Sequence, residues 1–119
     1  LKTNEITRKK SDFLEGTYAV HGIEEVMDNR DVVIIIDPFP EEEAKFSEVL
    51  EKGVGMKVFA ISPRESRFPT MSVPHMSEFG SYVQLVAGWS LLVEAGIELG
   101  INLDRPIRAR KVGNEYPGR

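Results

Sequence analysis

The sequence predicts an α/β fold with a mostly parallel sheet. Two unbroken apolar runs, Val32–Asp37 (VVIIID) and Met56–Ser62 (MKVFAIS), have the composition of strands. A β-branched run without alternation is typical of a strand that is buried on both faces, as in a parallel sheet. A segment with helical spacing separates the runs, which together form a βαβ unit with a right-handed crossover. We therefore expect the two runs to be neighbouring central strands.

The segment between the strands carries clear helix signals. Pro40 and three glutamates, Glu41–Glu43, are favourable in a first helical turn. The backbone N–H that proline lacks would have no hydrogen-bond partner there, and the acidic side chains are stabilised by the positive end of the helix dipole. Apolar residues then recur at helical spacing, and glycines end the pattern. The apolar positions are Ala44, Phe46, Val49 and Leu50, and the glycines are Gly53 and Gly55.

Residues 77–100 predict one long helix that is apolar nearly all round and ends at Gly100. A membrane span is disfavoured because Gln84, Glu94 and Glu98 interrupt it, so packing on the sheet or on a partner subunit is the better interpretation. Its apolar residues cover more of the helix than one sheet can hide, and we therefore expect it to pack against another chain or subdomain.

The remaining segments carry weaker signals. Leu1–Arg8 is predicted to be helical, and Asp12–Tyr18 to form a short strand. Residues 104–119 are too irregular for a core element. Their basic residues indicate either a solvated tail, the commoner case, or an ordered arm that brings cations to a phosphate or carbonyl group.

Composition excludes several classes of function. The chain has 119 residues and a net charge of -4, which argues against general nucleic-acid binding. It contains no cysteine and only two histidines, which leaves no thiolate site and makes a dedicated transition-metal site improbable. No signal segment is recognisable, and we expect a cytoplasmic protein that needs no cofactor.

Polar residues follow both predicted strands, at Asp37–Phe39 and Ser62–Arg64. Ligands of parallel sheets bind at the carboxyl ends of strands, so these segments are a candidate binding region. A phospho-accepting role for Asp37, as in a receiver domain, is a poor interpretation because no acidic pair follows an earlier strand.

Three segments of the sequence, LKTNEIT, TYAVHGIEEV and GINLDRPIRARKV, resemble the second half of a sugar isomerase (SIS) domain. More narrowly, they are similar to the isomerase part of glucosamine-6-phosphate synthase and its deglycase and deaminase relatives. The family patterns are L-K-x-K-E, G-E-x-x-H-G-P and D-x-P-R-x-L-x-K-V. The matching residues are Leu1, Lys2, Glu5, His21, Gly22, Asp104, Pro106, Lys111 and Val112.

The resemblance implies a flavodoxin-like three-layer sandwich in which residues 1–119 form the C-terminal SIS subdomain, incomplete at its N-terminus. The phosphate-binding loop of the family, S-x-S-G-x-T, belongs to the preceding subdomain and has no counterpart in this chain. Two positions depart from the family pattern. Ile23 replaces a proline, and Arg110 stands where a small residue is usual.

The resemblance also assigns catalytic roles to Glu5, His21 and Lys111. Glu5 would move a proton between C1 and C2 of an open-chain sugar, and His21 would open the ring, often across a subunit interface. Lys111 would hold the open-chain carbonyl as a Schiff base, and Arg110 would bind substrate. By composition alone, Glu5 is a surface glutamate, His21 a hydrogen-bonded loop histidine and Lys111 a solvated tail lysine.

The function implied is binding of a phosphorylated or amino sugar, such as fructose-6-phosphate or glucosamine-6-phosphate, and its aldose–ketose isomerisation. The reaction would run alone or be coupled to amination, deamination or deglycation. The expected assembly is a homodimer that also pairs with a preceding SIS subdomain, without nucleic acid or membrane partners. Two alternatives remain: a non-catalytic SIS module that senses a sugar phosphate, and a structural half-domain whose long helix serves dimerisation.

Overall fold

The computed structural model describes residues 2–108, which divide into two compact units. Asp12–Trp89 form one, which we call the sheet unit, and residues 2–11 and 90–108 form the other, which we call the helical unit. The long helix α3, Gly80–Glu98, contributes residues to both. Lys111 and Arg110 lie outside the described residues.

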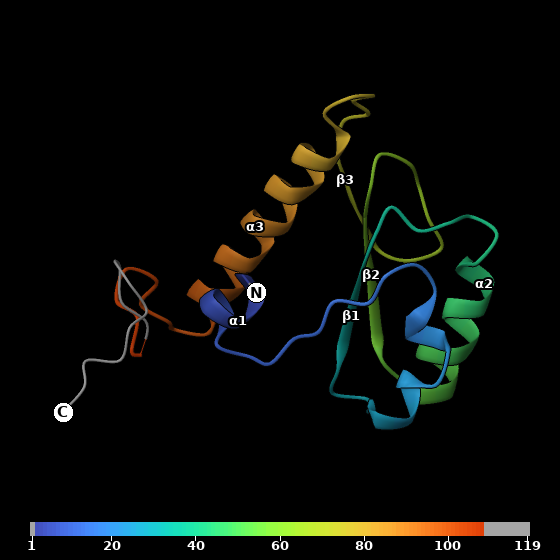
Figure 1. Cartoon of the computed structure of the whole chain (residues 1–119), viewed down its shortest axis with the longest axis horizontal. Coiled ribbons are helices and arrows are strands. Elements are labelled where there is room, and N and C mark those ends of the chain that lie inside the picture. The colour runs from blue at the N-terminus through green and yellow to red at the C-terminus, as the bar shows by residue number, and fades with distance from the viewer. Residues whose placement is uncertain (1, 109–119) are drawn as a thin grey trace. The chain divides into compact units, whose positions relative to one another are not determined.

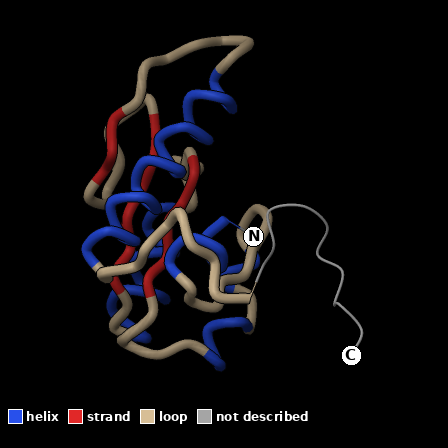
Figure 2. The backbone as a smooth tube through the Cα atoms, turned by 90° about the vertical axis from the view of Figure 1, so that its left-hand side faces the viewer, coloured by secondary structure: helices blue, strands red, loops and turns tan. Residues whose placement is uncertain are grey.

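The sheet unit contains a three-stranded parallel sheet (Figures 1 and 2). Its strands are β1 (Val32–Ile36), β2 (Lys57–Ser62) and β3 (Thr70–Ser72), in the order β1-β2-β3. β1 and β2 pair in parallel with Val32 opposite Lys57 and Ile36 opposite Ile61. The predicted parallel pairing of the two apolar runs is confirmed. β3 has no counterpart among the predicted strands.

The helical segment between β1 and β2 covers one face of this sheet (Figure 1). It consists of α2 (Glu43–Phe46) and a π-helical continuation, η3 (Ser47–Val54), and Gly55 ends it with φ 84°. Phe46 and the fully buried Leu50 pack with Val58 and Ala60 of β2 in the hydrophobic core. The predicted helix is confirmed, but it begins at Glu43 and not at Pro40, and Ala44 of its predicted apolar stripe is exposed.

The prediction that β1 is a central strand, buried on both faces, is wrong. β1 lies at one edge of the described sheet, and Val32, Ile34 and Ile36 are 54%, 40% and 49% exposed. Side chains alternate between the faces of a strand, and the core described above covers only one face of β1. On the other face of the sheet Ile61 is buried, and its Cδ1 would lie 4.0 Å from a Cβ at Gly88 of α3.

The predicted strand at Asp12–Tyr18 is also wrong. The segment is irregular, Phe13 is 88% exposed, and Gly16 turns the chain with φ 57°. Two short 3-10 helices follow, η1 (Tyr18–Val20) and η2 (Ile23–Val26). Ala19 and Val20 of η1 join the core instead.

The helical unit joins the short helix α1 (Lys2–Thr7) to the second half of α3. Gly96 is buried at this contact, where an added Cβ would lie 3.2 Å from Ile6 Cγ2 and 2.8 Å from Leu103 Cδ2. Arg8 Nη2 donates hydrogen bonds to the carbonyl oxygens of Asn102 (3.3 Å) and Arg105 (3.0 Å). The predicted helix at the start of the chain is confirmed.

Helix α3 begins three residues later than predicted, because Ser77–Phe79 form a turn, and Gly100 with φ 68° follows its end. Tyr82 and Trp89 are 66% and 45% exposed. Within residues 2–108, no helix is long and apolar enough to span a bilayer. Packing of α3 on another chain or subdomain stays a prediction.

Candidate functional site

A fixed pair of polar side chains lies at the carboxyl ends of β1 and β2. Asp37 follows β1 with φ 51°, a left-handed conformation that few residues other than glycine adopt. The hydroxyl of Ser62, the buried last residue of β2, donates a hydrogen bond to Asp37 Oδ1 at 3.0 Å. The backbone N–H of Asp37 also donates to the Ile61 carbonyl at 2.9 Å. The Asp37 carboxylate is therefore held at the sheet edge where ligands of parallel sheets bind.

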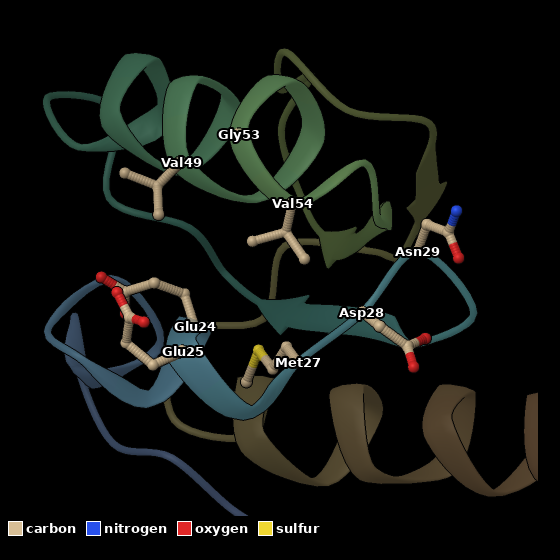
Figure 3. A pocket seen from close by; sticks show the side chains of 8 residues that line it. All are labelled: Glu24, Glu25, Met27, Asp28, Asn29, Val49, Gly53 and Val54. Carbon is tan, nitrogen blue, oxygen red and sulfur yellow. The ribbon is translucent and has the colours of Figure 1, made fainter.

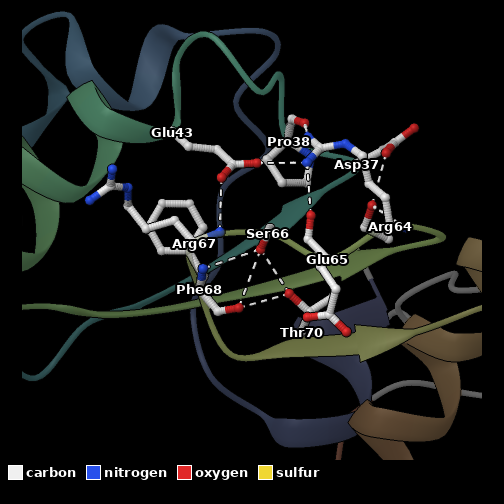
Figure 4. Close-up of polar contacts among 10 residues, drawn as sticks. Asp37, Pro38, Glu43, Arg64, Glu65, Ser66, Arg67, Phe68 and Thr70 are labelled. Carbon is white, nitrogen blue, oxygen red and sulfur yellow. Dashed lines mark hydrogen bonds and ion pairs between the residues drawn. The ribbon is translucent and has the colours of Figure 1, made fainter.

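An ion pair next to Asp37 fixes the loop that follows β2 (Figure 4). Arg64 Nη1 donates to Glu43 Oε1 at 2.8 Å, and Arg64 Nη2 donates to the Pro38 carbonyl. The backbone N–H of Arg67 donates to Glu43 Oε2 at 2.8 Å. Burial of the Glu43 side chain, which is 12% exposed, acts to raise its pKa, but the hydrogen bonds from Arg64 and Arg67 outweigh burial and lower it. Arg64 therefore serves to hold this loop against α2.

Hydroxyl groups bind the rest of the same loop to itself (Figure 4). Ser66 Oγ and Thr70 Oγ1 are 2.7 Å apart, and Thr70 Oγ1 donates to the Phe68 carbonyl at 2.7 Å. The backbone N–H of Phe68 donates back to Ser66 Oγ at 3.2 Å, and the Phe68 side chain is buried in the core. This part of the predicted binding region is thus a rigid scaffold.

A hollow of about 230 Å³ opens at the Asp37 edge of the sheet. Asp37 and Pro63 contribute from the loops after β1 and β2, His75 from the segment after β3, and Ser81 and Gln84 from the first turns of α3. Asp37 and Pro63 belong to the binding region that the sequence predicts, whereas His75, Ser81 and Gln84 were not predicted to take part. These residues follow β3, and a strand of three residues is too short to be recognised from the sequence. No sequence pattern therefore marked them as part of a site.

A second, wider hollow of about 600 Å³ lies between η2 and η3 (Figure 3). Val49 and Val54 point into it from η3, opposite Met27, and Glu24, Glu25 and Asp28 make it acidic. A hydrogen bond from the Arg30 side chain lowers the pKa of Asp28 to about 2. This open acidic surface is unfavourable for a phosphorylated ligand, because like charges repel.

Glu5, the predicted base, lies on α1 with its side chain half exposed. Lys2 Nζ donates a hydrogen bond to Glu5 Oε2 at 2.6 Å, one helical turn away. The carboxylate is therefore charge-paired and accessible to solvent.

His21, the predicted ring-opening residue, is exposed at the end of η1. Its Nε2 lies 3.1 Å from Thr17 Oγ1. Gly22 follows with φ 100°, a conformation that L side chains rarely adopt, and its N–H donates to Glu24 Oε2 at 2.6 Å. The tight turn at Gly22 thus leaves the imidazole accessible.

The structure does not unite the predicted catalytic set within one unit. Glu5 belongs to the helical unit and His21 to the sheet unit, and Lys111 and Arg110 lie outside the described residues. Among residues 2–108, no group of three or more histidine or acidic side chains is arranged to hold a metal ion. In comparisons with known proteins, no family model and no curated protein matches this chain.

Proposed function

We propose that this chain is the C-terminal SIS subdomain of a cytoplasmic protein that binds a phosphorylated or amino sugar and interconverts its aldose and ketose forms. The proposal rests on the resemblance of three segments of the chain to the SIS family. The parallel unit of β1, α2 with η3, and β2 supports it, because these elements follow His21 in the order that the resemblance implies.

The observation that carries the proposal is the exposed imidazole of His21 beside the positive φ of Gly22. Opening a sugar ring requires a group that gives and takes a proton near pH 7, and histidine is the side chain suited to this. A Cβ at Gly22 would meet no atom within 4 Å, so glycine is required there by the backbone conformation and not by a neighbouring atom. The imidazole is thus accessible to a sugar ring oxygen.

In the proposed reaction the Glu5 carboxylate removes the proton from C2 of the open-chain aldose. The C1–C2 enediol that results is reprotonated at C1 by the Glu5 carboxyl group, whose proton exchanges with solvent, while a hydroxyl proton moves from O2 to O1. This gives the ketose without any oxidant or reductant. Where Lys111 holds the open-chain carbonyl as a Schiff base, one water is released, the intermediate is the corresponding enaminol, and hydrolysis of the Schiff base takes the water up again. Arg110 would bind the substrate. The reaction would run alone or coupled to amination, deamination or deglycation.

The proposed assembly is a homodimer that also pairs with a preceding SIS subdomain, which would supply the phosphate loop. The exposed apolar side chains of α3, including Tyr82, Val86 and Trp89, support such pairing. Burying large apolar side chains in an interface lowers the free energy of the assembly.

A second candidate function is a non-catalytic SIS module that senses a sugar phosphate. The specific observation in its favour is the ion pair between Glu5 and Lys2. This i,i+3 pair engages the carboxylate oxygen that a base would need free, and it is the arrangement typical of a solvent-exposed helix surface. A sensor needs ligand contacts but no base.

One experiment separates these functions. The complete natural polypeptide, wild type or Glu5→Gln, is incubated in D₂O with fructose-6-phosphate or glucosamine-6-phosphate and followed by proton NMR. If Glu5 is the base, wild type forms the isomer with deuterium at C1 or C2, and Glu5→Gln loses about a hundred- to ten-thousand-fold in rate. Glu94→Gln, an exposed glutamate of α3, is the matched control and should keep the wild-type rate.

Ligand-induced shifts in the protein spectrum report binding in the same samples. Binding without isotope exchange in wild type would replace the isomerase with the sensor. Exchange at the wild-type rate in Glu5→Gln would remove Glu5 from the mechanism.

A further inference from the structure

We propose that the hollow at the carboxyl ends of β1 and β2 binds the hydroxyl groups of one uncharged monosaccharide unit. Its lining combines a fixed carboxylate, Asp37, with groups that both donate and accept hydrogen bonds, among them Ser77, Ser81 and Gln84. At about 230 Å³ it is smaller than the roughly 300–1,000 Å³ of sites for drug-sized ligands, which suits a single sugar ring.

The carboxylate of Asp37 is prepared to accept hydrogen bonds from a ligand. Ser62 occupies Oδ1, and the buried position of Ser62 fixes the direction of the carboxylate. Sugar hydroxyl groups can donate to Asp37 and accept from Ser81 and Gln84 at the same time. Such charge-assisted hydrogen bonds are the stronger kind.

The backbone at Asp37 supports a ligand-binding role. A non-glycine residue at φ 51° costs about 1–3 kcal/mol, and such strain tends to gather at ligand-binding positions. The strained residue places its carboxylate at the edge of a parallel sheet, where ligands of α/β proteins bind.

The charge of the hollow selects against a phosphate group. Asp37 is the only carboxylate among the lining residues, and neither lysine nor arginine lines the hollow within the part of the chain that is described. Arg64, the nearest cation along the chain, is engaged with Glu43 and the Pro38 carbonyl. A phosphate dianion would meet an unneutralised negative charge, whereas uncharged hydroxyl groups would not.

This site shares no residue with the proposed catalytic set of Glu5, His21 and Lys111. Failure of the isomerase proposal would therefore leave it intact, and its test measures binding and not turnover.

The test is an NMR titration of the complete chain, labelled in its histidine and glutamine side chains. D-Glucose and D-fructose should shift the His75 and Gln84 signals and saturate, whereas sodium phosphate at the same ionic strength should leave them in place. Two results would overturn the proposal. One is saturation by phosphate alone. The other is the absence of any shift with 100-fold excess sugar up to about 0.1 M, a concentration well above the 1 mM scale of weak binding.

Two variants test the contacts. Asp37→Asn keeps the side-chain shape, the acceptor for Ser62 and a residue type that tolerates positive φ, so the loss of charge should weaken sugar binding about tenfold or more. Gln84→Leu should weaken it roughly three- to tenfold. Glu25→Gln, in the other hollow, is the control that should bind as wild type does. Wild-type sugar affinity in both Asp37→Asn and Gln84→Leu would overturn the proposal.

Discussion

Two glycines of α3 are predicted to respond in opposite directions to the same substitution, because their neighbours differ. Gly88→Ala places a methyl group 4.0 Å from Ile61 Cδ1, which is an ordinary van der Waals contact. Gly96→Ala places it 2.8 Å from Leu103 Cδ2, 3.2 Å from Ile6 Cγ2 and 3.3 Å from the Ile6 carbonyl oxygen. Leu103 can rotate away, but the Ile6 backbone moves only together with α1.

The magnitude follows from two opposing effects. Replacing glycine by alanine inside a helix raises the free energy of unfolding by about 1 kcal/mol. Overpacking a tight contact lowers it by about 1–3 kcal/mol. Gly88→Ala should therefore be stabilised by about 0.5–1 kcal/mol, and Gly96→Ala destabilised by about 1 kcal/mol. Each kcal/mol corresponds to roughly 3–6 °C in Tm for a chain of this length.

The measurement is urea unfolding followed by far-UV circular dichroism and by fluorescence of Trp89, the single tryptophan, which lies between the two glycines. Both variants change the same residue type in the same helix, so each serves as the control for the other. The reasoning fails if Gly96→Ala unfolds at the same or a higher urea concentration than Gly88→Ala.

Two further predictions concern the polar contacts of the sheet unit. Because the pKa of Glu43 is lowered by folding from an ordinary 4.5, its stabilising effect is complete above that value and is lost as the pH falls through the lower folded pKa. Glu43→Gln should thus be less stable than wild type at pH 7, by about 1–3 kcal/mol, because the charged hydrogen bonds are lost. The difference in unfolding free energy between the two proteins should disappear in urea titrations toward pH 3. A difference that does not depend on pH would contradict this. Gly22→Ala should lose about 1–2 kcal/mol in unfolding free energy, because its φ of 100° strains any L side chain although space is free; an unchanged urea midpoint would refute the strain.

The elements that could be predicted from sequence are those whose signal is local. The β-branched run of β1, the apolar run of β2 and the helical stripe around Leu50 each carry their own pattern. The exposed face of Ile34 could not be predicted, because burial of a strand depends on which elements cover it. β3 was not predicted because Thr70–Ser72 form only three paired residues, too few for a recognisable strand pattern.

The candidate site was predictable only in part, for the same physical reason. Asp37 is visible because it directly follows a strand, whereas Gln84 reaches the same hollow from a helix far along the chain. Glu5 and His21 are distinguished in the sequence only by the resemblance to the SIS family. The structure adds their partners, Lys2 at the i,i+3 spacing of a helix and Thr17 in the turn before η1.

The contrast between two loops has a consequence for how proteases attack this chain. Arg64 and Arg67 are potential trypsin sites, yet their loop is bound through Glu43, so cleavage there requires local unfolding. Lys9 and Lys10 are exposed in an irregular segment that leads from α1 to the sheet unit, and trypsin should cut there first.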